Sequence, residues 1–178
     1  MKFVAISGSL RKGSSNTAVL RAAARLAPRE VDVVLFDGIA GLPFFNPDLD
    51  GYEVPAPVAA FRATIGSADA ILISSPEYAR GVAGVMKNAL DWLVASVEFP
   101  DKPVALINTS PRAAHALAAL RLTLETMSAQ IVDEACITLP LLGTASSEDD
   151  IVGSAELADA LRDAMTRFAG AVRTLQSG

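Results

Sequence analysis

Hydrophobic residues of this chain gather in short unbroken runs, separated by longer stretches with a different period. Four runs are rich in β-branched residues; they span residues 3–7, 31–35, 70–75 and 104–108, and all but residues 31–35 end in a small polar residue. Runs without apolar–polar alternation are typical of strands buried on both faces of a parallel sheet. A fifth, more polar run covers residues 130–137 and is expected at a sheet edge.

Between these runs, apolar residues recur at the spacing of helices that pack one face on a core. The predicted helices contain residues 18–26, 58–65, 85–94, 117–127 and 157–175. Strict alternation of strands and helices predicts an α/β doubly wound sheet, and five parallel strands favour the flavodoxin-like order 2-1-3-4-5 with helices on both faces. We expect residues 1–178 to form one such domain.

Composition excludes several classes of function. The 178 residues carry a net charge of −5, which argues against a nucleic-acid partner and against an anionic membrane surface. The single Cys136 and single His115 rule out an internal disulfide and His-pair metal sites, so no metal is expected. No apolar run is long enough to span a bilayer, and the first is too short for a signal peptide, so a soluble, cytoplasmic protein is expected.

Ligands of doubly wound sheets bind beyond the carboxyl ends of the strands. This places the candidate site on three loops, at residues 8–16, 75–84 and 109–115.

The first of these loops has the chemistry of a phosphate site. It supplies hydroxyl donors, a helix start that Ser15 or Asn16 can cap, and Arg11, whose planar fork can bind two phosphate oxygens. It is not a nucleotide P-loop, because Ser14 stands where that motif requires Lys. The G-x-G-x-x-G pattern is absent as well.

The second loop suits a planar ligand held by backbone amides. Pro76 fixes its exit from the strand, Gly81 and Gly84 are expected to allow unusual backbone dihedrals, and a helix is predicted to begin near Gly84.

Two long motifs in these loops resemble the NADPH-dependent FMN reductase family, which includes quinone, chromate and azo reductases. The family patterns G-S-x-R-x-x-S-x-N and P-E-Y-x-x-x-x-x-G-x-x-K-N-A-L-D-W match from Gly8 and from Pro76, in the right order along the chain. The chain departs from many members at Ala79-Arg80, where they have Asn-Gly.

The resemblance implies a bound FMN that takes hydride from NADPH or NADH and passes it to a small acceptor in a ping-pong cycle. The flavin performs the chemistry, so no catalytic side chain is implied. The phosphate is implied to bind Ser9, Arg11, Ser15, Asn16 and Thr17. The ring site is implied to involve Pro76, Glu77, Tyr78 and Gly81, with Ser110 and Arg112 touching its other side.

The resemblance also implies a homodimer or homotetramer. We expect the apolar face of the third predicted helix to supply its interface; that face comprises Met86, Leu90, Leu93 and Val94, with Trp92 beside it.

Two other functions stay open at this point. One is a flavodoxin-type electron carrier without its own turnover, although Arg11 and the moderate charge are unlike such carriers. The other is a small hydrolase or nucleoside-transferring enzyme on the same fold, which the missing G-x-S-x-G elbow weakens. The sequence leaves undecided the physiological acceptor, the choice between NADPH and NADH, and the role of Arg80.

Overall fold

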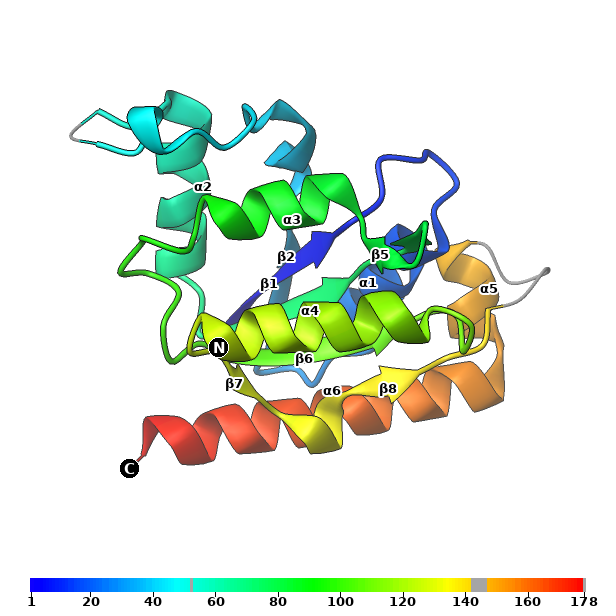
Figure 1. Ribbon diagram of the computed structural model, residues 1–178. Helices are drawn as coiled ribbons and strands as arrows, with labels where there is room; N and C mark the ends of the chain where they lie inside the picture. Colours follow the sequence, from blue (N-terminus) through cyan, green and yellow to red (C-terminus); the bar gives the residue numbers. More distant parts are fainter. Residues whose placement is uncertain (52, 142–146, 178) are drawn as a thin grey trace.

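A computed structural model describes residues 1–51, 53–141 and 147–177. Its main sheet has the strand order β2-β1-β3-β6-β7, with β8 also paired to β6, and every pairing in it is parallel (Figure 1). The strands are β1 (Lys2–Ser7), β2 (Asp32–Leu35), β3 (Ala70–Ser74), β6 (Pro103–Asn108), β7 (Gln130–Ile131) and β8 (Ile137–Thr138). The predicted order 2-1-3-4-5 is therefore confirmed.

Helices cover both faces of the sheet, and each face has its own hydrophobic core. The helices α1, α5 and α6 pack on one face, and α2, α3 and α4 pack on the other (Figure 1). Their bounds are α1 (Ser15–Leu26), α2 (Ala56–Gly66), α3 (Gly84–Asp91), α4 (Ala114–Thr126), α5 (Glu148–Gly153) and α6 (Ala155–Gln176). Among the described residues, no helix is both long and apolar enough to cross a bilayer.

The three central strands are buried as their apolar runs predict, but β2 is not. Its side chains alternate, with Asp32 and Val34 exposed and Val33 and Leu35 half-buried. The reason is its place in the sheet: β2 pairs only with β1, so one face lies beyond the helices that cover the centre. The prediction that this run is buried on both faces was wrong.

The fifth apolar run does lie at the sheet edge, but it is broken into two short strands. The 3₁₀ helix η3 (Asp133–Ala135) separates β7 from β8, and each strand pairs with a different end of β6. Cys136 lies at this break, half-buried rather than fully buried, and its Sγ accepts a hydrogen bond from the Leu106 N–H at 3.3 Å.

Burial raises the pKa of the Cys136 thiol, and Leu106 and Arg121 only partly oppose that shift. A thiol whose pKa is higher in the folded state holds its proton more tightly there. The stability that this shift contributes is present below the ordinary thiol pKa and is lost as the pH rises through the pKa of the folded state.

We expect the free energy of unfolding of the wild type to fall at alkaline pH, as measured by urea unfolding. The fall should be absent in Cys136→Ser, whose hydroxyl can still accept from the Leu106 N–H. Equal falls in the two proteins would contradict the assignment of this pH dependence to Cys136.

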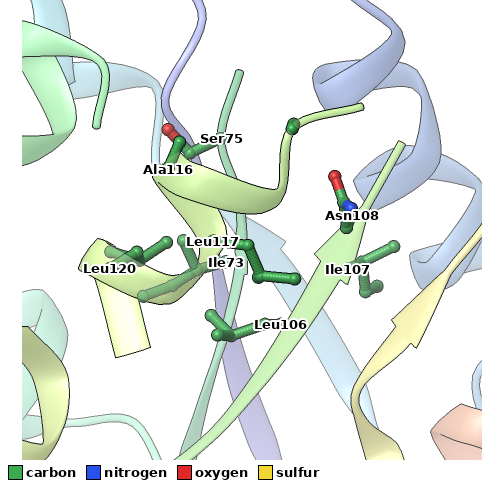
Figure 2. A pocket seen from close by; sticks show the side chains of 9 residues that line it. Ile73, Ser75, Leu106, Ile107, Asn108, Ala116, Leu117 and Leu120 are labelled. Carbon is green, nitrogen blue, oxygen red and sulfur yellow. The ribbon is translucent and has the colours of Figure 1, made fainter. Parts of the chain in front are cut away.

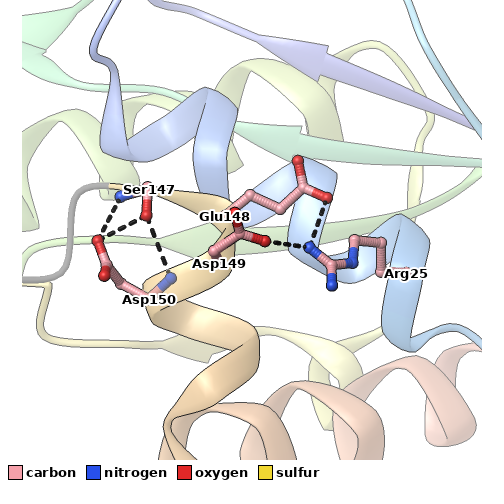
Figure 3. A network of polar contacts seen from close by, with 5 residues as sticks. All are labelled: Arg25, Ser147, Glu148, Asp149 and Asp150. Carbon is pink, nitrogen blue, oxygen red and sulfur yellow. Dashed lines mark hydrogen bonds and ion pairs between the residues drawn. The ribbon is translucent and has the colours of Figure 1, made fainter.

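The chain after β8 is joined to α1 by an ion-paired cluster. Arg25 contacts Glu148 at 3.2 Å and Asp149 at 2.6 Å, and Ser147 and Asp150 form a capping box at the start of α5 (Figure 3). The cluster lies near the carboxyl end of α1, where a cation is favoured by the helix dipole. It links α5 to α1 on the face of the sheet where Ile151 of α5 is buried in the core.

Candidate functional site

Gly8 allows the first two loops to meet. Its N–H donates to the Ser74 carbonyl at 2.8 Å, and a Cβ at this position would lie 2.2 Å from Ser75 Oγ and 3.1 Å from Ser75 Cα. A side chain would therefore push the first loop away from the end of β3.

Beyond Gly8, the first loop is shaped by its own hydroxyl groups and leaves a run of backbone donors free. Ser7 Oγ and Thr17 Oγ1 lie 2.8 Å apart, and Ser9 Oγ accepts from the Arg11 N–H at 3.4 Å. Within the described part of the chain, several backbone N–H groups of this loop donate to no other group; they belong to Leu10, Lys12, Gly13, Ser14, Ser15 and Asn16. Such a run at a helix start is suited to an anion.

Ser14, and not Ser15 or Asn16, caps α1. Its backbone is extended and its buried Oγ accepts from the Thr17 N–H at 3.3 Å, whereas Ser15 is already the first helical residue. The predicted caps, Ser15 or Asn16, were wrong by one or two residues. Ser14 is also the residue on which the second serine of the family pattern falls.

We expect Ser14→Ala to lower the free energy of unfolding by about 1 kcal/mol, since it removes a helix cap. Ser15→Ala is the matched control and is expected to change it by less than about 0.5 kcal/mol. Urea unfolding of the ligand-free variants measures both. Equal losses in the two variants would contradict the assignment of the cap to Ser14.

Asn16, in the first turn of α1, connects the ends of β3 and β6. Its Oδ1 accepts from Ser74 Oγ at 2.9 Å and from Thr109 Oγ1 at 3.3 Å, and all three residues are buried. These two hydroxyl donors fix the orientation of the amide, because only its oxygen can accept. The Nδ2 donors are thereby left for a ligand in the adjoining pocket, which Asn16 lines.

This pocket has a volume of about 300 Å³ and opens between the second and third loops. The residues that line it are Asn16, Ser75, Pro76, Glu77, Asn108, Thr109, Ser110, Arg112 and Ala113.

The second loop contains a short hairpin that was not predicted from the sequence. Strands β4 (Glu77–Tyr78) and β5 (Gly81–Val82) pair antiparallel around a two-residue turn at Ala79 and Arg80. Both turn residues have positive φ, of 50° and 61°. Neither Gly81 nor Gly84 has a φ in that range, so the expectation that the glycines carry the unusual dihedrals was wrong.

The third loop is held by bonds within itself. Asn108 Nδ2 donates to the Ser110 carbonyl at 2.7 Å, Asn108 Oδ1 accepts from the Ser110 N–H at 3.2 Å, and Ser110 Oγ accepts from the Arg112 N–H at 3.3 Å. The loop therefore has a defined shape on its side of the pocket.

The charges around the site are mainly positive, although the chain as a whole is acidic. Arg11 and Lys12 on the first loop, Arg80 on the hairpin and Arg112 on the third loop are all exposed. Glu77 is the only carboxylate on these loops, and one of its oxygens is already hydrogen-bonded to the Ala116 N–H. The site therefore favours an anionic ligand over a cationic one.

A family model confirms the resemblance drawn from the two motifs. The model for NADPH-dependent FMN reductase matches residues 1–141, most of the chain. The chain belongs to this family.

Relatives in the family carry names of the same kind. An NAD(P)H-dependent FMN reductase of Pseudomonas aeruginosa is 43% identical over 112 residues, which are 62% of this chain and 60% of that protein. A quinone reductase of Escherichia coli is 40% identical over 115 residues, again 62% and 60%. The matched segment thus spans about three-fifths of the length of these relatives.

Solved structures agree with the fold over a longer stretch. The flavoenzyme NAD(P)H:(acceptor) oxidoreductase FerB of Paracoccus denitrificans is 28% identical, with a TM-score of 0.81 and 97% of each chain covered. An archaeal flavodoxin is 16% identical with a TM-score of 0.65, a likeness that supports the flavodoxin-like fold alone.

The residues suggested by the family motifs fall into three groups in the structure. Those that line the pocket are Asn16, Pro76, Glu77, Ser110 and Arg112. Those on the first loop or first turn of α1 are Ser9, Arg11, Ser15 and Thr17. Those on the hairpin, outside the pocket lining, are Tyr78 and Gly81.

Apart from Thr109, which belongs to the third loop that the resemblance places against the ring, three pocket residues were not among those predicted. Ser75, Asn108 and Ala113 also line it. The first two could have been found, because each is a polar residue where a buried strand ends, at the edge of the sheet where ligands bind. Ala113 has no such signal.

Proposed function

We propose that this chain is an FMN-dependent oxidoreductase, which uses NADPH or NADH to reduce a small acceptor such as a free flavin or a quinone. The observation that carries the proposal is the first loop. Its free backbone N–H groups and Arg11 lie at the start of α1, beside a pocket into which Asn16 can donate. An anion site that adjoins a pocket suits a ligand in which a phosphate group is joined to a planar ring system.

The donors present fit FMN. We assign the phosphate to the loop amides together with Ser9, Arg11, Ser15, Asn16 and Thr17, because a phosphate accepts hydrogen bonds and carries negative charge. The assignment of Thr17 has the least support of these, since its hydroxyl is already hydrogen-bonded to Ser7 Oγ. We assign the ring to the pocket walls at residues 75–77 and 108–113, with Tyr78 and Gly81 at the rim.

Bound FMN supplies the capacity to accept and release hydride, and the protein supplies binding and orientation. Backbone N–H groups of the second and third loops are the groups we expect to stabilise charge on the reduced ring. No side chain is assigned as a general acid or base. The pocket is open to solvent between the second and third loops, so NAD(P)H and the acceptor would reach a bound flavin from that side, one after the other.

The acceptor class is supported by the relatives, whose names include quinone reductase. An open site that must admit both nicotinamide and acceptor makes few specific contacts with either. We therefore propose a ping-pong cycle with a range of small quinone-like acceptors.

The test is to add FMN to the purified protein, remove unbound flavin, and record the visible spectrum and the oxidation of NADPH with a benzoquinone. We expect a retained flavin spectrum and turnover well above that of the same concentration of free FMN. A retained flavin without turnover would favour an electron carrier. A colourless protein would overturn FMN binding.

Assembly as a homodimer or homotetramer is a separate proposal. The face expected to form the interface does not do so, because Met86, Leu90, Trp92 and Leu93 are buried in the core of the chain itself. Val94 alone of that set is exposed. Size-exclusion chromatography with light scattering tests the assembly, and a monomer would contradict it.

A further inference from the structure

The carboxylate of Glu77 joins the two walls of the pocket. Glu77 lies on β4 in the second loop, and its Oε2 accepts from the backbone N–H of Ala116 at 2.9 Å. Ala116 is the third residue of α4, the helix that follows the third loop. The bond therefore connects segments that lie 39 residues apart in the sequence and face each other across the pocket.

Helix α4 depends on this carboxylate for its cap. Helices α1, α5 and α6 are each capped by their own serine, at Ser14, Ser147 and Ser154. The N-cap residue of α4 is Ala113, which has no side chain able to accept. A helix start has backbone N–H groups without partners and a positive dipole end, so a carboxylate from another loop is favourable there.

At the first turn of α4, the two walls meet through small side chains. Beneath the first turn of α4 lies a void of about 10 Å³, which is lined there by the small residues Ala113, Ala116 and Ser75. Ala116 and Ser75 are shown in Figure 2. The larger contacts lie deeper, where Leu117 and Leu120 of α4 meet the strands. Among the described residues, Glu77 to Ala116 is the only hydrogen bond between residues 75–82 and 108–117.

We propose that Glu77 is a positioning residue, whose carboxylate sets the separation of the second and third loops and thereby the width of the ring pocket. This inference rests on the proposed function, since it assumes that the pocket holds the flavin ring. Glu77 takes no part in proton transfer: it acts through the backbone of α4.

The experiment compares Glu77→Ala with Glu77→Gln, whose amide oxygen can still accept from Ala116. FMN and riboflavin are the two ligands, because riboflavin has the ring and no phosphate, and Arg11→Ala serves as the comparison variant. We expect Glu77→Ala to weaken both ligands together, by roughly five- to tenfold. Glu77→Gln should stay within about twofold of the wild type, and Arg11→Ala should weaken FMN alone.

A second readout needs no ligand. In the flavin-free protein, the amide hydrogen of Ala116 should exchange with solvent faster in Glu77→Ala than in the wild type or Glu77→Gln, as measured by NMR, if the carboxylate protects it. A Glu77→Ala variant with unchanged ring affinity, or a Glu77→Gln variant as weak as Glu77→Ala, would overturn the inference. A wild-type protein that binds neither flavin would instead overturn the proposed function, and with it this inference.

Discussion

Replacing Arg11 with alanine is expected to weaken FMN binding by about 1.5–3 kcal/mol, or roughly 10- to 150-fold in Kd. The guanidinium is exposed on the first loop and has no ion-pair partner among the described residues. It is therefore free to form two charge-assisted bonds with a phosphate. Titration of the flavin-free variant with FMN, followed by quenching of flavin fluorescence, measures the loss.

Lys12→Ala is the matched control, because it removes the same charge from the neighbouring position of the same loop. We expect it to weaken FMN by less than Arg11→Ala, since a lysine cannot form the two parallel bonds of a guanidinium. Arg11→Lys should lie between the wild type and Arg11→Ala for the same reason. Equal losses in Arg11→Ala and Lys12→Ala would show a general effect of charge and contradict a specific phosphate contact.

The sequence predicted the strands that are buried on both faces of the sheet. Strands β1, β3 and β6 are covered by helices on both faces, so their sequences are continuous apolar runs that cannot be mistaken for amphipathic elements. The hairpin of β4 and β5 was not predictable in this way. Its strands have two residues each and lie half-buried or exposed, so they leave no periodic pattern.

The site was predictable to the level of its loops but not of its individual contacts. The strand order alone places the three loops at one edge of the sheet, which brings Arg11, Glu77 and Arg112 to the same region. The bonds of Asn16 to Ser74 and Thr109 span 58 and 93 residues of sequence, and depend on how the strands are aligned. No local motif contains that information.

The backbone conformation of the hairpin turn also could not be predicted from the local sequence. Two-residue hairpins favour turns in which both central residues have positive φ, and Asn-Gly is the preferred pair. Here Ala79 and Arg80 adopt that conformation without the help of a glycine or an asparagine. The tertiary structure imposes the turn on residues that disfavour it, and the nearby glycines keep ordinary dihedrals.

The double variant Ala79→Asn, Arg80→Gly is therefore expected to raise the free energy of unfolding by about 1–2 kcal/mol. A side chain in the left-handed region costs roughly 1–2 kcal/mol, and the greater freedom of glycine in the unfolded chain offsets part of the gain. Urea unfolding of the flavin-free protein is the measurement.

Arg80→Ala separates strain from charge in this experiment. It removes the cation but keeps a Cβ at positive φ, so it is expected to leave the stability within about 0.5 kcal/mol of the wild type. If Arg80→Ala stabilises the protein as much as the double variant does, charge repulsion around the basic loops is the cause and backbone strain is not.

The strained turn joins the two strands that carry Glu77 and Gly81, so FMN affinity should be measured on the same variants. If the double variant is more stable and its FMN affinity is unchanged, the side chains of Ala79 and Arg80 make no contribution to flavin binding.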